Sequence, residues 1–434
     1  MLIQLYFHIF VIYHTDTERM FLKINRKSYY IFFTVSALFI SVSSSSCRVK
    51  DSDIKGKIEN CQDIPIDEEL AHRMDSCFKK YLRYGPTAIY LYDITADKPI
   101  YGYNKDSLMH SASCMKLLTG VAALQLLGTD YIYETKLLIN GEVVDEKLNG
   151  DLTLMTGLDP QLLTSDFTVF AKELKQKGIK EIEGNIYIDA QLTTPVKAEE
   201  HWYPWDLTFN RYGILFKGGE RVMRDFKASI RAQGIKYDSK KVSFGKVSEN
   251  SKCIFTLQRP IGDVVKKMWE NSSNTQSTAL LYNIGMNYKP EGNFVDNGIE
   301  YLKEFVKEEL RLKDHDAIIH DGCGLCIHNK LTPELLVRVL RYGYYKKSIY
   351  EMMQSYFPVS GKTGSLRSEM VNSKARGKIY AKTGTLSHPY GISTLAGFCK
   401  GKNDHLLCFA IMSYNMSVLD GRMIQRKMCE EFIK

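Results

Sequence analysis

Three short motifs, each carrying groups used in nucleophilic chemistry, occur in one order along this chain of 434 residues. They supply a serine with an amine beside it, a second hydroxyl next to an amide, and a lysine that opens a Lys-Thr-Gly run. In chain order they are Ser113-Cys114-Met115-Lys116, Ser272-Ser273-Asn274 and Lys382-Thr383-Gly384-Thr385. If the fold brings the three motifs together, the site contains the groups needed to transfer an acyl group to a serine.

The surroundings of Ser113 favour a helix that begins at a nucleophile. Residues 87–93 and 99–103 are rich in aromatic and β-branched residues and predict two strands. Residues 114–127 are apolar at helical spacing, so Ser113 opens a helix. Backbone N–H groups at a helix start stabilise an oxyanion, and Lys116 lies one turn on, on the same face. A lysine beside an apolar helix loses hydration, which lowers its pKa and suits it to act as a base.

The second motif has a plain local context. Ser272 and Asn274 lie in a polar run between predicted helices at 261–269 and 278–286. Taken alone, such a run is usually an ordinary loop between two helices. Its position after a credible Ser-x-x-Lys motif is what favours a functional role.

The third motif lies in a predicted group of strands near the C-terminal end. The elements predicted here are strands at 378–386, 392–399 and 406–412, a tight turn at 400–403 and a helix at 419–433. Lys382 and Thr383 can hold a carboxylate through a charge-assisted bond and a hydroxyl. Gly384 would let a substrate backbone approach the strand without interference from a Cβ atom. A second Lys-Thr-Gly run begins at Lys362.

The chain resembles the class C-type low-molecular-mass penicillin-binding proteins, the D-alanyl-D-alanine carboxypeptidase/endopeptidase family, from about Thr87 onward. The three motifs match that family's SxxK, SxN and KTG triplet in order. Further segments that resemble the family are Gly150-Asp151-Leu152-Thr153-Leu154, Asp159-Pro160-Gln161-Leu162, residues 182–189, Trp205-Asp206, Tyr212-Gly213, Asp321-Gly322-Cys323-Gly324-Leu325 and residues 358–366. The last match makes Lys382 the active lysine and Lys362 a spare.

The resemblance implies an α+β fold of the penicillin-binding and β-lactamase-like transpeptidase type. Its antiparallel sheet is flanked by helices, and a smaller α/β domain is inserted into it. We expect the DD-peptidase domain at residues 65–130 and 219–434 and the inserted domain at 131–218. The insertion is expected to be trimmed, because the stretch between the first two motifs is shorter than in the family.

The resemblance also implies the role of each catalytic group in a serine peptidase of peptidoglycan stem peptides. Ser113 attacks the carbonyl between two D-alanines, or the D-alanyl cross-link to a neighbouring stem peptide, and Lys116 takes its proton. Ser272 relays a proton to the leaving amine with the support of Lys382. Asn274 orients the substrate amide.

The third motif completes the site implied by the resemblance. Thr383, Gly384 and Thr385 bind substrate, and the backbone N–H groups of Ser113 and Thr385 form the oxyanion hole. Water then releases the acyl group, and β-lactams act as covalent inhibitors. Two alternatives stay open: a serine β-lactamase, which needs fast deacylation, and a catalytically degenerate protein that only binds the cell wall.

Some residues near the site depart from the family pattern. Ser273 stands where aspartate is usual, and Cys323 and Cys326 stand where serines are common. The two cysteines form a lone Cys-x-x-Cys near His328, with no partner pair at zinc spacing. We therefore expect no metal site and no cofactor.

Charge and cysteine content bound the remaining possibilities. The formal net charge of +8 is mild and spread out, and no basic and aromatic module for nucleic acid is visible. Ten cysteines in an exported chain raise the possibility of disulfides. Cys399 and Cys408 lie in apolar runs and are expected in the core.

The first 47 residues read as a signal peptide, and specifically as a lipoprotein signal. A basic segment precedes the short apolar stretch 29–40, and a serine run leads to Cys47, a candidate for lipidation. Met20 is an alternative start to Met1. We expect a protein of the bacterial cell envelope, in the periplasm, that contacts the membrane only through this signal or a lipid anchor.

Overall fold

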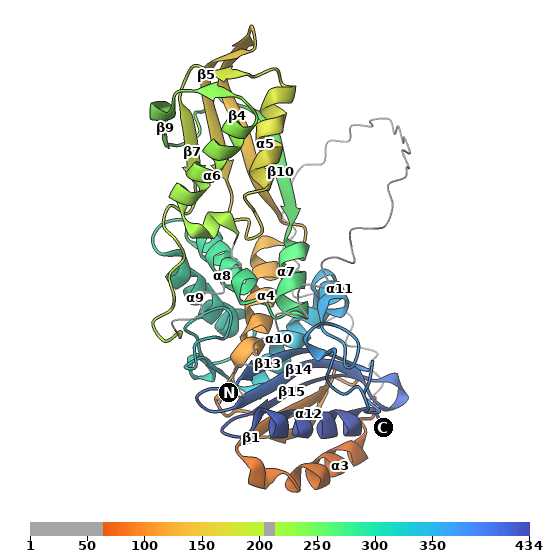
Figure 1. The fold of residues 1–434 in the computed structure, drawn as a ribbon. Helices are drawn as coiled ribbons and strands as arrows, with labels where there is room; N and C mark the ends of the chain where they lie inside the picture. Colours follow the sequence, from red (N-terminus) through yellow and green to blue (C-terminus); the bar gives the residue numbers. More distant parts are fainter. Residues whose placement is uncertain (1–63, 204–212) are drawn as a thin grey trace, which may run out of the picture. The chain divides into compact units, whose positions relative to one another are not determined.

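The computed structural model describes residues 64–203 and 213–434, and its first sheet is antiparallel with five strands in the order β13-β14-β15-β1-β2 (Figure 1). The strands are β1 (Thr87–Asp93), β2 (Lys98–Tyr103), β13 (Ile379–Leu386), β14 (Ile392–Lys400) and β15 (Leu406–Ser413). Each of these was predicted from its run of aromatic and β-branched residues. β1 is buried along its whole length, because both faces of the sheet are covered. The N-terminal and C-terminal parts of the chain therefore share one sheet.

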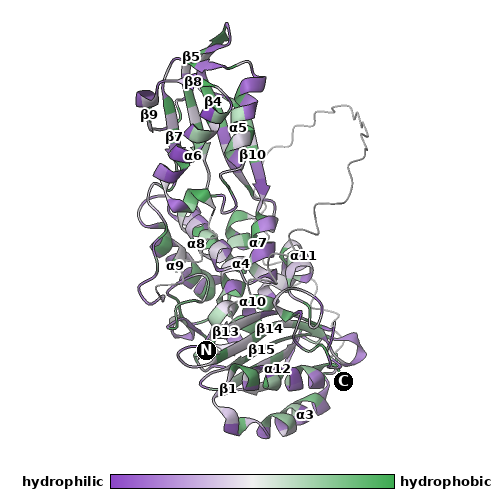
Figure 2. Cartoon of the chain, in the orientation of Figure 1, coloured by the Kyte–Doolittle hydropathy of each residue, from purple (hydrophilic) through white to green (hydrophobic). Residues whose placement is uncertain are grey.

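Helices cover both faces of this sheet, which confirms the predicted α+β architecture (Figure 1). On one face, α3 (Glu68–Lys79) and α12 (Val418–Phe432) pack against β1, β14 and β15. Both helices are amphipathic and carry apolar and polar residues side by side in Figure 2. Ile424 and Phe432 of α12 are among the side chains buried on that face. Full burial of such a side chain contributes about 1.5–3 kcal/mol to folding.

The opposite face carries the helices that hold the first two motifs. They are α4 (Met115–Leu127), α7 (Ile261–Glu270), α8 (Asn274–Tyr288), α9 (Phe294–Glu304), α10 (Pro333–Tyr345) and α11 (Lys347–Tyr356). The first ten residues of α4 are buried, because α7, α8, α9 and α10 all contact it. Gly120 permits this packing, since a Cβ atom there would lie 2.6 Å from the Trp269 ring.

A second, mixed sheet lies between α4 and α7 in the sequence. Its strands are β4 (Ile132–Val144), β5 (Lys147–Thr156), β6 (Glu181–Ile182), β7 (Ile186–Ala190), β8 (Lys236–Tyr237), β9 (Val242–Phe244) and β10 (Lys252–Pro260). The β4–β5 hairpin pairs antiparallel with β10, whereas β6 and β7 pair parallel with β5. Helices α5 (Asp166–Gln176) and α6 (Gly219–Ala232) pack on it through Phe167, Phe170 and Phe226.

The boundary predicted at residue 218 cuts through this second sheet. Helix α6 and strands β8, β9 and β10 all follow residue 218, yet they pair with or pack on β4 to β7. The unit that belongs with the second sheet therefore extends to Pro260, where β10 ends and α7 begins. The local pattern missed this because strand pairing over such a sequence distance leaves no periodic signal.

A small third sheet brings a distant loop to the nucleophile segment. Strand β12 (Lys330–Leu331) pairs with β3 (Met109–His110) and with β11 (Ala317–Ile318). Residues 319–329 are thereby held next to the turn that contains Ser113.

Several expectations fall outside the described residues. Cys47 and the whole signal segment do so, as do Trp205, Asp206 and Tyr212. Within residues 64–203 and 213–434, no helix is both long and apolar enough to cross a membrane. The cysteines of those residues are present as free thiols, and Cys399 and Cys408 lie in the core as predicted.

Candidate active site

Ser113 lies on a short 3-10 turn, Ala112–Cys114, that leads directly into α4. The helix was predicted to begin at Cys114, and one tight turn precedes it. Ala112 has φ of +41°, a conformation that costs a non-glycine residue about 1–3 kcal/mol and persists only where the surroundings impose it. This turn places the Ser113 hydroxyl at the positive end of a buried helix.

Lys116 lies one turn further along and is completely buried. Its Nζ lies 2.9 Å from Ser113 Oγ, 2.7 Å from Asn274 Oδ1 and 2.5 Å from the Cys323 carbonyl oxygen. Burial lowers the pKa of Lys116 below its ordinary value of 10.5. A larger fraction of the amine is therefore neutral near pH 7, as a base for the Ser113 proton requires.

Ser272 and Asn274 lie where α7 gives way to α8. Ser272 has φ of +56°, and the Ser273 side chain caps α8 by accepting a hydrogen bond from the Gln276 backbone. The helix therefore begins at Asn274, four residues before the predicted start. Ser273 performs a capping role that aspartate would also fill, so this departure from the family pattern leaves the local structure intact.

Lys382 lies on β13, an edge strand of the five-stranded sheet, and its side chain is completely buried. Its Nζ donates to Ser272 Oγ at 2.8 Å and to the Thr383 carbonyl at 2.6 Å. Burial, reinforced by the nearby charge of Lys116, lowers the pKa of Lys382 to about 7. Lys362, the first residue of the spare Lys-Thr-Gly run, is exposed.

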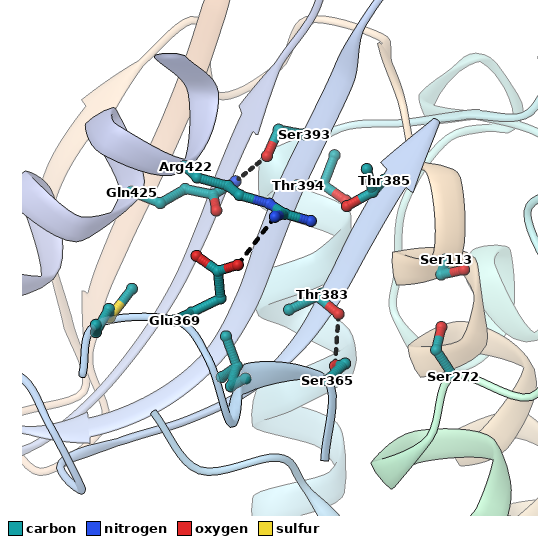
Figure 3. A pocket seen from close by; sticks show the side chains of 12 residues that line it. Ser113, Ser272, Ser365, Glu369, Thr383, Thr385, Ser393, Thr394, Arg422 and Gln425 are labelled. Carbon is teal, nitrogen blue, oxygen red and sulfur yellow. Dashed lines mark hydrogen bonds and ion pairs between the residues drawn. The ribbon is translucent and has the colours of Figure 1, made fainter. Parts of the chain in front are cut away.

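All three motifs meet at one cavity of about 200 Å³, and Figure 3 shows Ser113 and Ser272 across it from β13. Thr383 and Thr385 line it from β13. The structure adds cavity residues that we did not predict: Ser365, Glu369, Ser393, Thr394, Arg422 and Gln425.

Two of the unpredicted side chains interact closely with each other. Arg422 on α12 forms an ion pair of 2.9 Å with Glu369, and both line the cavity (Figure 3). The hydroxyl oxygens of Ser365 and Thr383 lie 2.6 Å apart and share a hydrogen bond. No sequence spacing marks Arg422, because α12 carries it into the site from the far end of the chain. Ser365 follows the spare Lys-Thr-Gly run and was noted only as part of that segment.

Gly384 has a packing role in addition to the one predicted from the sequence. A Cβ atom there would lie 2.0 Å from Thr394 Oγ1, 2.9 Å from the Ser111 carbonyl and 3.0 Å from the Ser113 backbone nitrogen. The missing side chain thus lets β13 pack against the turn that contains Ser113.

We expect Gly384→Ala to lower stability and site integrity together. Overpacking of this kind typically costs about 1–3 kcal/mol, and here the shift would move Ser113. Thermal unfolding and the rate of covalent labelling of Ser113 measure the two effects. The matched control is Gly102→Ala on β2, where the nearest atom is the flexible Lys105 side chain at 3.2 Å. An unchanged labelling rate in Gly384→Ala would contradict the packing argument.

The loop at residues 321–329 packs behind Lys116. The buried Asp321 carboxylate accepts hydrogen bonds from the backbone N–H groups of Cys323, Gly324 and Cys326. Gly324 packs so closely that a Cβ atom there would lie 1.9 Å from the Ala112 carbonyl. Because Lys116 contacts the backbone oxygen of Cys323, a cysteine supplies this contact as well as a serine would.

Comparison with known proteins gives a family assignment. The model of the D-Ala-D-Ala carboxypeptidase 3 (S13) family matches residues 75–212 and 215–432. The D-alanyl-D-alanine carboxypeptidase DacB of Haemophilus influenzae is 23% identical, over 76% of this chain and 86% of its own length. A D-alanyl-D-alanine carboxypeptidase from an Actinomadura species is 21% identical, over 75% and 77%.

Solved structures agree in fold. Penicillin binding protein 4 of Haemophilus influenzae superposes with a TM-score of 0.68 at 20% identity, covering 82% of this chain and 97% of the other. A predatory peptidoglycan endopeptidase from Bdellovibrio bacteriovorus gives 0.53 at 19% identity, covering 75% and 85%. The family model matches most of this chain, and the three motifs meet at one cavity, so this chain belongs to the D-Ala-D-Ala carboxypeptidase 3 (S13) family of serine peptidases.

Proposed function

We propose that the chain is a penicillin-binding D-alanyl-D-alanine carboxypeptidase and endopeptidase that acts on peptidoglycan stem peptides through an acyl-enzyme on Ser113. The observation that carries this proposal is the position of the buried Lys116 amine, which lies 2.9 Å from Ser113 Oγ at the N-terminal end of α4. An amine with a lowered pKa beside a hydroxyl at a helix start is the arrangement that activates a serine nucleophile.

The first half of the proposed reaction forms the acyl-enzyme. Ser113 Oγ attacks the D-alanyl carbonyl while its proton passes to neutral Lys116. The oxyanion accepts hydrogen bonds from the backbone N–H groups of Ser113 and Thr385. The leaving amine takes a proton relayed through Ser272, whose hydroxyl already accepts a hydrogen bond from Lys382. Water then attacks the ester, and Ser113 regains its proton.

Binding of the substrate relies on the edge strand. We propose that Lys382 and the Thr383 hydroxyl hold the terminal carboxylate, and that Asn274, itself fixed by Lys116, orients the substrate amide. Thr385 lines the same cavity as Ser113, which supports its proposed position beside the substrate. Arg422 adds a second cation there, partly neutralised by Glu369.

Intact mass spectrometry with a penicillin, followed over time, tests this function. We expect one adduct per chain at Ser113 that clears slowly, and release of D-alanine from a pentapeptide stem in a parallel assay. Rapid clearance of the adduct would instead favour a β-lactamase. Absence of both the adduct and D-alanine release would favour a protein that only binds the cell wall.

We expect the acylation rate constant at low penicillin concentration to fall as the pH rises above about 7, roughly tenfold per pH unit. The reason is that Lys382, with a pKa of about 7, loses the positive charge that holds the penicillin carboxylate. Lys382→Arg, which stays charged, should flatten this alkaline limb. Lys362→Arg on the exposed spare motif is the control and should keep the wild-type profile. An alkaline limb that survives in Lys382→Arg would show that another group titrates.

The site of action is proposed from the substrate class. Stem peptides belong to the bacterial cell envelope, so we propose a periplasmic enzyme that reaches the membrane through its N-terminal signal or a lipid on Cys47. Radiolabelled palmitate incorporation, lost in Cys47→Ala, would support the lipid anchor, and equal incorporation in both would contradict it.

A further inference from the structure

Four side chains that could bind a metal ion lie together behind the active-site loop. Glu199 and His201 come from the segment that follows β7, and His320 and Cys326 come from the loop between β11 and β12. One ligand atom from each lies within 4.8 Å of every other. Cys326 is buried, and the other three are partly exposed. None of the four takes part in the chemistry proposed above.

The set of donor atoms favours zinc over other common ions. Two imidazoles, one thiolate and one carboxylate make four ligands, the number found in structural zinc sites. Magnesium and calcium prefer oxygen ligands, so a thiol and two imidazoles disfavour them. Ligand atoms around tetrahedral zinc lie roughly 3.5 Å apart, given bonds of about 2.0–2.3 Å. The widest possible separation of 4.8 Å would therefore close by about 1.3 Å, and the His201 Nδ1–Glu199 Oε1 pair, now at 2.6 Å, would open by about 1 Å.

The two segments are held in place independently of the cluster. The Asp321 carboxylate accepts hydrogen bonds from the Cys326 backbone N–H at 2.7 Å and from the Trp202 indole N–H at 2.7 Å. Trp202 follows His201 in the sequence, and Asp321 follows His320. The hydrogen bond between Trp202 and Asp321 therefore holds the two histidine-bearing segments together. Pre-organisation by a surrounding shell of this kind is typical of metal sites.

The ordinary alternative is a hydrogen-bonded group of surface histidines. His201 Nδ1 does lie 2.6 Å from Glu199 Oε1, and His320 Nδ1 lies 3.9 Å from the same oxygen. What favours a metal ion over hydrogen bonds alone is that a buried thiol, two imidazoles and a carboxylate all direct a ligand atom to one point. A further imidazole, that of His328, lies beside them, with its ring centre 4.4 Å from that of His201.

We propose that Glu199, His201, His320 and Cys326 bind one Zn²⁺ ion, which joins the segment after β7 to the active-site loop. Binding displaces the thiol proton of Cys326 to solvent and leaves the zinc oxidation state unchanged. The loop so joined carries the Cys323 carbonyl, which contacts Lys116, and Gly324, which packs on Ala112. The ion would therefore stabilise the wall behind the catalytic base without touching the substrate.

The test counts metal in the full chain, purified without a histidine tag, stripped with a chelator and dialysed against Zn²⁺. We expect about one zinc per chain in the wild type and at least tenfold weaker binding in Cys326→Ser and in His201→Ala. The matched controls are Cys253→Ser and His315→Ala, which remove an exposed thiol and an exposed imidazole elsewhere. Both controls should keep the wild-type stoichiometry.

Cobalt supplies a second readout that does not depend on activity. Co²⁺ in place of zinc should give a sulfur-to-cobalt charge-transfer band that disappears in Cys326→Ser. Circular dichroism shows whether each variant is folded. If Cys326→Ser does not fold, the near-isosteric variant Glu199→Gln takes its place in the zinc count. No zinc in the wild type, or unchanged stoichiometry in folded Cys326→Ser or Glu199→Gln, would overturn the proposal. Because the count is independent of turnover, its failure would leave the proposed peptidase function untouched.

Discussion

Ser113→Ala should form no covalent adduct with penicillin and should lose D-alanine release by at least about a thousandfold. The change removes the single oxygen that bonds to the acyl group, whereas Lys116 keeps Asn274 and the Cys323 carbonyl as partners. We therefore expect the fold to survive. Intact mass spectrometry measures the adduct, and thermal unfolding checks the fold.

The structure contains a rival pair that makes this experiment informative. Ser272 Oγ lies 2.8 Å from Lys382 Nζ, a separation similar to that between Ser113 and Lys116. We favour Ser113 because it lies at the start of α4, where backbone N–H groups stabilise an oxyanion. An adduct that persists in Ser113→Ala and maps to Ser272 would reverse the two roles. Ser365→Ala, which removes another hydroxyl of the same cavity, is the matched control and should still be acylated.

Lys116→Met should slow acylation by roughly a hundredfold to ten-thousandfold, the usual contribution of a positioned base. Methionine fills much of the space of the lysine chain but cannot accept a proton. It also leaves Asn274 Oδ1 and the Cys323 carbonyl without their donor, at a cost of about 1–3 kcal/mol for each buried group left unpaired. Stopped-flow acylation and thermal unfolding should therefore both change.

The control for this variant is Lys362→Met, in the exposed spare motif. It should leave the acylation rate and the unfolding temperature close to those of the wild type. Wild-type acylation by Lys116→Met would show that Lys116 is a structural cation only. In that case Lys382, with its pKa of about 7, would become the candidate base.

Local patterns in the sequence predicted much of the first sheet and the contact between Ser113 and Lys116. Ser113 and Lys116 lie one helical turn apart, so their contact follows once a helix is predicted there. Strands β1, β14 and β15 are short apolar runs between turns, and helix α12 has an amphipathic period, so a short window of sequence reveals each of them. The reaction itself was inferred from the family that these motifs and their flanking segments resemble.

Other features depend on contacts between distant parts of the chain, which no local pattern in the sequence can reveal. Strands β8 to β10 join the second sheet through partners far away in sequence, so the predicted boundary at 218 was wrong. The choice of Lys382 over Lys362 came from resemblance, and burial beside Ser272 is what distinguishes them physically. Arg422 enters the cavity from the last helix.

The cluster at Cys326 shows the same division most clearly. The Cys323-x-x-Cys326 pair near His328 has no second pair of ligands at the spacing typical of zinc sites, so the sequence predicted no metal site. Two members of the proposed zinc site, Glu199 and His201, lie in another segment, and the hydrogen bond from Trp202 to Asp321 holds that segment against the loop. Sequence spacing records only neighbours along one helix or strand. A site assembled by long-range packing becomes visible once the chain has folded.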